Sequence, residues 1–199
     1  LQAVETLGSI QTICLDKTGT ITRNRMTVTR IATAQRRIDV QDAQFTNDRQ
    51  PLNPLAIAEL RELLVCGCLC SETKINGTAV PGEVELLGTS TENALVHASL
   101  MAGLDIKGCR QDHPLVSLQH RSEQRPYMVS CHETPDGHRC HYVKGSPPEV
   151  LAMCRQQMQN GAVVALDRFE GNAVVRLSDP MSAQALLVLG RAFCEVGDG

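Results

Sequence analysis

The feature that most constrains this chain is an apolar run at residues 10–15 that ends in Asp16 and continues as a polar loop, DKTGT, at residues 16–20. A short apolar run followed by small polar residues is typical of a strand buried in a parallel sheet, which delivers the next residue to the C-terminal edge of that sheet. A carboxylate at such an edge is ionised near neutral pH and can attack an electrophile without a general base. We therefore expect the strand at residues 10–15 to present Asp16 as a reactive group.

Composition bounds what the rest of the chain can do. The 199 residues are 42% hydrophobic, which favours a packed core over disorder, and the net charge of -3 gives no basic field for nucleic acid or an anionic membrane. No apolar stretch of roughly 18 residues occurs, so no transmembrane helix is predicted. The start at Leu1 rather than Met leads us to expect a segment of a longer protein.

Beyond residue 27 the pattern predicts antiparallel strands with inserted helices, which is an α+β organisation. Helical spacing and capping signals predict helices at residues 55–70, 91–101, 147–159 and 179–196. Ser146 is expected to cap the third helix in a capping box with Glu149.

Strands are predicted where apolar residues alternate with polar ones or form short runs flanked by turn residues. They are expected at residues 27–31, 38–45, 127–131, 138–143, 162–167 and 172–177. The Pro-Asp-Gly sequence at residues 135–137 is a strong turn signal, so the third and fourth of these strands should form a hairpin.

Cysteine and histidine residues form two groups that could bind a metal. The first is Cys66, Cys68 and Cys70, which we interpret as reduced thiols that serve as small core residues on a helix, with a soft-metal site as the alternative. The second lies across the predicted hairpin and contains Cys131, His132, His138, Cys140 and His141. Strand alternation sends sequence neighbours to opposite faces, so an ordinary half-buried hairpin is favoured over a zinc site.

The stretch DKTGTITxNxM at residues 16–26 resembles the phosphorylation motif of P-type ATPases, in particular their type II branch. Four further stretches resemble motifs of the same family and follow in the family's order, so that the resemblance spans nearly the whole chain. They are GTSTENAL at residues 88–95, residues 120–128, VKGSPPE at residues 143–149 and ALLVL at residues 185–189.

The resemblance implies two domains. Residues 1–27 would be the N-terminal part of the phosphorylation domain, a haloacid-dehalogenase-like α/β fold, and residues 28–199 the nucleotide-binding domain, an antiparallel sheet flanked by helices. The parent would be an integral membrane pump with this segment on the cytoplasmic face. Its partners would be ATP and the remainder of the pump, with no nucleic acid and no direct membrane contact.

In that family the aspartate at position 16 attacks the γ-phosphate of ATP and becomes an aspartyl-phosphate. By the same resemblance, Lys17 and Thr18 would orient the γ-phosphate, and Mg²⁺ would be held by the Asp16 carboxylate and the Thr18 carbonyl. Hard oxygen ligands suit that ion.

The nucleotide site implied by the resemblance has two parts. Lys144 and Gly145 match the family's ATP-pocket lysine and the glycine after it, and Glu92 matches a glutamate that contacts the adenine amino group. A lysine at a strand end can also be an ordinary solvated residue, and Glu92 can simply complement the helix dipole.

Three positions depart from the family pattern. Arg121 falls where a phenylalanine usually stacks on adenine, and its guanidinium either stacks there or lies on the surface. Arg125 matches the first residue of a basic triplet whose remainder is lost. Leu187 replaces an arginine that usually reaches the phosphates, so weak ATP binding or an adapted pocket is expected.

These observations predict an ATP-binding segment of a cation-transporting P-type ATPase. The segment alone is expected neither to pump ions nor to phosphorylate itself efficiently. Two alternatives stay open: a regulatory domain with weak ATP affinity, and a haloacid-dehalogenase-like phosphatase, which would need a second Asp where Thr18 stands. The transported ion is not assigned, because calcium, magnesium, sodium/potassium and proton pumps share these motifs.

Overall fold

The computed structural model describes residues 25–77, 84–166 and 180–196. The expectations for Asp16, Lys17 and Thr18, for the buried strand at residues 10–15 and for the strand at residues 172–177 therefore lie outside the described residues. The haloacid-dehalogenase-like segment stays a prediction for the same reason.

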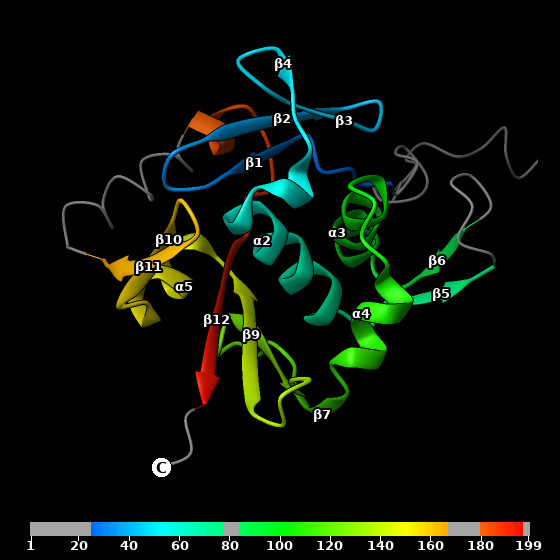
Figure 1. The fold of residues 1–199 in the computed structure, drawn as a ribbon, viewed down its shortest axis with the longest axis vertical. Coiled ribbons are helices and arrows are strands. Elements are labelled where there is room, and N and C mark those ends of the chain that lie inside the picture. The colour runs from blue at the N-terminus through cyan, green and yellow to red at the C-terminus, as the bar shows by residue number, and fades with distance from the viewer. Residues whose placement is uncertain (1–24, 78–83, 167–179, 197–199) are drawn as a thin grey trace, which may run out of the picture.

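The central sheet is antiparallel and has the strand order β12-β9-β8-β7. Its strands are β7 (Leu115–Gln119), β8 (Tyr127–Glu133), β9 (Arg139–Gly145) and β12 (Gly190–Val196). The chain therefore returns from far along the sequence to place β12 beside β9 (Figure 1).

One helix, α2 (Ala58–Leu69), lies at the centre of the molecule and contacts β9, β12, α3 and α4 (Figure 1). It follows the 3-10 helix η2 (Pro54–Ala56), which Asn53 caps by accepting a hydrogen bond from the Leu55 amide. The neighbouring helices are α3 (Ser90–Met101) and α4 (Ile106–Asp112).

Three small sheets surround this centre. The N-terminal meander consists of β1 (Arg30–Ala32), β2 (Arg37–Gln41), β3 (Gln44–Asn47) and β4 (Gln50–Pro51). The other two sheets have two strands each. They pair β5 (Lys74–Asn76) with β6 (Glu85–Leu87), and β10 (Gln156–Gln159) with β11 (Ala162–Ala165). Helix α5 (Pro147–Met153) connects β9 to β10.

Three apolar clusters form the core, and α2 contributes to each of them. Leu60 and Leu64 pack against the meander, Cys66 and Cys70 pack against the central sheet, and Cys68 packs toward α3 and α4. A helix that is buried on several sides can carry small thiols where bulkier side chains would clash. The expected role of these cysteines as small core residues is confirmed.

Much of the predicted fold is confirmed. The described residues mix helices and antiparallel strands, as the α+β prediction requires. The hairpin of β8 and β9, helix α3 and the helical stretch at residues 55–70 all occur close to the expected bounds. None of the described helices is long and apolar enough to cross a membrane.

Two helices predicted near the C-terminus are shorter than expected. The helix expected over residues 147–159 ends at Met153, and residues 156–159 form β10 instead. The reason is the Asn160–Gly161 turn, whose residues both have positive φ, +49° and +79°, as a two-residue hairpin turn requires. Similarly, the helix expected over residues 179–196 is helical only at residues 180–183 in its described part, and Gly190–Val196 pairs with β9 as a strand.

Two local predictions are also corrected. Ser146 is the N-cap residue of α5, but its side chain accepts no capping hydrogen bond, so the predicted capping box is absent. The single strand expected over residues 38–45 is a hairpin of β2 and β3, turned at Asp42 and Ala43 with φ of +48° and +63°.

Candidate functional site

A buried ion pair joins the first turn of α3 to the end of β9. The Lys144 Nζ atom lies 2.6 Å from Glu92 Oε1 and also donates to the Cys70 carbonyl oxygen at 2.7 Å. The side chains of Lys144 and Glu92 are only 10% and 9% exposed. A buried ammonium is tolerated when a carboxylate and further acceptors surround it, so the three groups form one unit.

Local sequence signals place both charged groups. Thr89 caps α3 by accepting a hydrogen bond from the Glu92 amide, which sets Glu92 in the first helical turn. Along β9, Cys140, Tyr142 and Lys144 are buried at alternate positions and face α2. The alternation therefore directs Lys144 under α2, toward Cys70 and Glu92.

Two glycines lie beside this pair. Gly145 of β9 is directly opposite Gly190 of β12. A Cβ atom on Gly145 would lie 2.6 Å from Tyr127 Cβ, and one on Gly190 would lie 3.0 Å from Pro147 Cα. The backbone is therefore closely packed where the two strands meet α5, which explains glycine at both positions.

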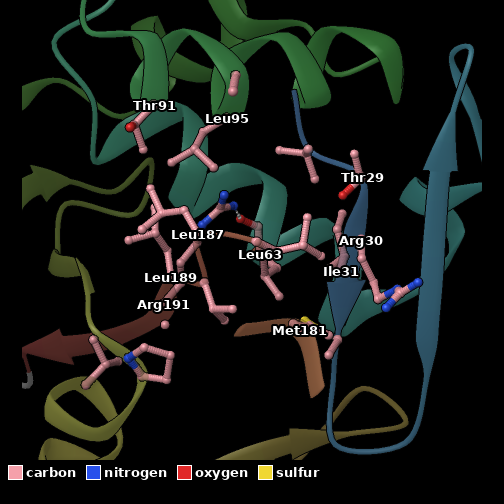
Figure 2. Close-up of a pocket in the computed structure, with 18 of the residues that line it drawn as sticks. Thr29, Arg30, Ile31, Leu63, Thr91, Leu95, Met181, Leu187, Leu189 and Arg191 are labelled. Carbon is pink, nitrogen blue, oxygen red and sulfur yellow. Dashed lines mark hydrogen bonds between the residues drawn. The ribbon is translucent and has the colours of Figure 1, made fainter. Parts of the chain in front are cut away.

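Next to the glycines is a cavity of about 500 Å³ (Figure 2). It is lined by β1, α2, α3, α5 and residues 185–191, and its wall is largely apolar, with Leu63, Leu95, Met181 and Leu189 among the lining residues. Thr91, the neighbour of Glu92, also lines it. A cavity of this size and character suits a small organic ligand.

Arg191 lines the same cavity and was missed by sequence reasoning. It lies directly opposite Lys144 across β12 and β9, and its Nη1 atom donates to the Leu63 carbonyl oxygen at 2.6 Å. Burial lowers the pKa of the Arg191 guanidinium. The available signal was an arginine at an alternate position of GRAFCEV, although this stretch was assigned to a helix.

The remaining predicted residues are placed elsewhere. Arg121 is exposed in the loop between β7 and β8, and Arg125 donates to Gln119 Oε1 at 3.0 Å and to the His120 carbonyl oxygen at 2.7 Å. Neither arginine lines the cavity, and neither do Glu92, Lys144 and Gly145. Leu187 lines it and is 60% exposed. The structure thus brings Glu92, Lys144 and Gly145 together and leaves Arg121 and Arg125 in a surface loop.

Both cysteine-containing groups singled out in the sequence are candidates for a metal site. Within the described part of the chain, no group of three or more His, Cys, Asp or Glu side chains could hold a metal ion. Burial raises the pKa of Cys66 to about 12 and that of Cys140 to about 11, so both stay neutral thiols near neutral pH. Whether these residues bind a metal stays a prediction, and the hairpin of β8 and β9 itself is present.

Several known proteins are similar to this chain in sequence. A family profile described as P-type ATPase, cytoplasmic domain N matches residues 59–198. The chain is 31% identical over 204 residues to a plasma membrane-type calcium-transporting ATPase 10 of Oryza sativa, covering all of the chain and 19% of that protein. It is 30% identical over 198 residues to calcium-transporting ATPase 1 of Lactococcus lactis, covering all of the chain and 21% of that protein.

A third relative is cation-transporting ATPase pma1 of Synechocystis, 32% identical over 206 residues, with 96% of the chain and 22% of that protein covered. The chain thus spans about a fifth of the length of the curated relatives it matches. The family profile covers well over half of the chain and includes both partners of the buried ion pair. The chain therefore belongs to the P-type ATPase family and contains its cytoplasmic domain N.

Proposed function

We propose that this chain binds ATP for a cation-transporting P-type ATPase, with Glu92, Lys144 and Gly145 as the part of the site that receives the base. The observation that carries the proposal is the buried Lys144–Glu92 pair, whose atoms lie 2.6 Å apart beside a glycine pair. Thr91 and Gly190, which neighbour this group, line the apolar cavity. The relatives named above are calcium- or cation-transporting ATPases, which supports ATP as the ligand.

The pair retains capacity to bind a ligand. An ammonium has three N–H donors, and Lys144 uses two described acceptors, Glu92 Oε1 and the Cys70 carbonyl oxygen. Glu92 accepts through Oε1, and no hydrogen bond from the described residues reaches its Oε2 atom. Glu92 Oε2 would therefore accept from the adenine amino group, and the remaining Lys144 N–H would donate to a ring nitrogen.

We extend the proposal to residues 1–27 as the first part of the phosphorylation domain. Asp16 would attack the γ-phosphate, and Lys17 and Thr18 would orient it. The Asp16 carboxylate and Thr18 carbonyl are hard oxygen donors that fit Mg²⁺, which would supply positive charge for phosphoryl transfer. The parent would then drive cation transport through an aspartyl-phosphate at Asp16, with this segment on the cytoplasmic face of the membrane.

The test of ATP binding is a titration of the ¹⁵N-labelled chain with ATP, followed by amide chemical shifts. We expect saturable shifts at Glu92, Lys144 and Gly145, and smaller shifts at Arg121, which lies in the surface loop. The absence of any shift up to several millimolar ATP would instead favour a regulatory domain that has lost nucleotide affinity.

A second assay concerns Asp16. The chain alone is expected not to incorporate phosphate efficiently from labelled ATP. Stable incorporation that disappears in Asp16→Asn would show that this segment contains a working phosphorylation site.

A further inference from the structure

Arg191 lies on the same face of the central sheet as the proposed base site. It is directly opposite Lys144 in the antiparallel pairing of β12 with β9, and the next pair on this face is Phe193 with Tyr142. Side chains directly opposite each other in such a pair lie close together. Arg191 is therefore a direct cross-strand neighbour of Lys144, as Met128 is on the other side, and it faces α2 beside Lys144.

The guanidinium of Arg191 has no counter-ion within the described part of the chain. Its described hydrogen-bond partner is the Leu63 carbonyl oxygen, at 2.6 Å from Nη1. Arg191 is half-buried, and its guanidinium has several further N–H donors that can bond to an anion. The Lys144 ammonium is paired with the Glu92 carboxylate, whereas no carboxylate of the described residues pairs with the Arg191 guanidinium.

Helix α2 has room for this guanidinium at Gly67. A Cβ atom on Gly67 would lie only 2.6 Å from Arg191 Nη1. Glycine in the middle of a helix costs about 1 kcal/mol relative to alanine. Helix α2 therefore has a lower helix propensity at Gly67, and the missing side chain leaves space for the Arg191 guanidinium.

The charged residues that line the cavity beside Arg191 are arginines. Two arginines and no carboxylates are among the described residues that line it. Arg30 is paired with Asp39 through a 2.9 Å contact, and it also donates to Gln184 Oε1. Arg191, in contrast, has no carboxylate partner among the described residues, so its charge is available to a ligand. The wall around it is largely apolar (Figure 2).

We propose that Arg191 binds the phosphate chain of the nucleotide. This inference rests on the proposed ATP binding at Glu92 and Lys144. A guanidinium can donate two parallel N–H bonds to phosphate oxygens, which makes arginine well suited to this role. Arg191 then contacts the anionic part of the ligand, while Glu92 and Lys144 contact the base.

The test compares ADP with adenosine, which shares the base but lacks phosphate. Dissociation constants are measured by NMR titration for the wild-type chain, Arg191→Met, Arg191→Lys and Arg139→Met as the matched control. Arg139 is an exposed arginine at the opposite end of β9. We expect Arg191→Met to weaken ADP binding roughly 10- to 100-fold, as the loss of a charged hydrogen bond does, and to change adenosine binding less than about twofold.

Two control variants separate loss of the phosphate contact from a general effect of the substitution. Arg191→Lys should lose part of the ADP affinity, because lysine keeps the positive charge but cannot donate two parallel N–H bonds to a phosphate. Arg139→Met should bind both ligands as the wild type does. Equal weakening of ADP and adenosine in Arg191→Met, or no weakening of either, would overturn the assignment of Arg191 alone. A wild-type chain that binds neither ligand would overturn the proposed function itself.

A measurement on the wild-type chain avoids any folding defect of the variants. The side-chain Nε–Hε resonance of Arg191 is followed during titration with ADP and with adenosine. We expect a saturable shift with ADP and little change with adenosine. A resonance that moves equally with both ligands, or with neither while the Lys144 amide responds, would contradict the proposal.

Discussion

Lys144 Nζ and Glu92 Oε1 lie 2.6 Å apart although 52 positions separate the two residues in the chain. The contact joins the central sheet to α3, and the Cys70 carbonyl ties the same ammonium to the end of α2. One lysine thus links three elements of the fold at the proposed nucleotide site.

This relationship predicts strong coupling between the two charges. Lys144→Met leaves the Glu92 carboxylate buried and unpaired, so it should lower the free energy of unfolding by about 3–5 kcal/mol. The double variant Glu92→Gln/Lys144→Met should recover much of that loss because no buried charge remains. Urea unfolding of the wild type, both single variants and the double variant gives the coupling energy. Additive losses in the double variant would show that the pair contributes no mutual stabilisation.

Gly67 and Arg191 should also be coupled. In the wild type, Gly67→Ala gains helix propensity of about 1 kcal/mol but moves the Arg191 guanidinium from its hydrogen bond to Leu63, which costs about 1.5–3 kcal/mol. The substitution should therefore be destabilising in the wild type and stabilising in an Arg191→Met background. Chemical denaturation of the four chains measures this change of sign. A stabilising effect in both backgrounds would mean that Arg191 does not need the space.

Gly145→Ala should lower stability by about 1–3 kcal/mol through overpacking. The new Cβ would lie 2.6 Å from Tyr127 Cβ and 3.0 Å from Tyr127 Cα, so backbone as well as side chain must move. Gly190→Ala, whose closest contact would be 3.0 Å, should lose less. Thermal unfolding of both variants compares them, and a larger loss for Gly190→Ala would contradict this packing.

His132 should make the fold less stable in mild acid. Burial lowers the pKa of its imidazole, and the Nδ1 atom donates to the His113 carbonyl at 2.9 Å. Because the folded pKa is below the unfolded value of about 6.5, the unfolded chain takes up the proton first as pH falls. The stability that the neutral ring contributes is therefore present above that value and is lost as pH falls from it toward the folded pKa.

The check is the urea midpoint at pH about 7.5 and about 5.5 in the wild type, His132→Gln and His97→Gln. His132→Gln should reduce the drop between the two values, while His97→Gln should retain it because His97 is exposed on α3. An unchanged drop in His132→Gln would rule out this residue as its source.

Local signals account for the parts of the fold that the sequence predicted. The Pro-Asp-Gly turn at residues 135–137 marks the hairpin, and the signals at the start of α3 placed that helix within one residue. The Asn160–Gly161 pair is an equally local turn signal, although the sequence pattern predicts a helix up to residue 159. By contrast, Gly190–Val196 is a strand because β9 offers it a pairing edge, and the local alternation in this stretch does not identify that partner.

In the candidate site, too, the sequence marks individual residues but not the contacts between them. Motif position marked Glu92, Lys144 and Gly145, and the structure brings these residues together. Motif position alone could not show that Glu92 and Lys144 pair with each other, because the pairing depends on how α3 packs against α2. Arg191 was missed because the facing relationship with Lys144 exists only once β12 is known to be a strand.

The central claim is that the Lys144–Glu92 site binds ATP. The most direct measurement is the dissociation constant of ATP for the wild type, Lys144→Gln and Arg139→Gln, with folding of each chain verified by its amide spectrum. We predict that Lys144→Gln weakens ATP binding roughly 10- to 100-fold, as the loss of a charged hydrogen bond does, and that Arg139→Gln binds as the wild type does. An ATP affinity that is the same in folded Lys144→Gln as in the wild type would contradict the account.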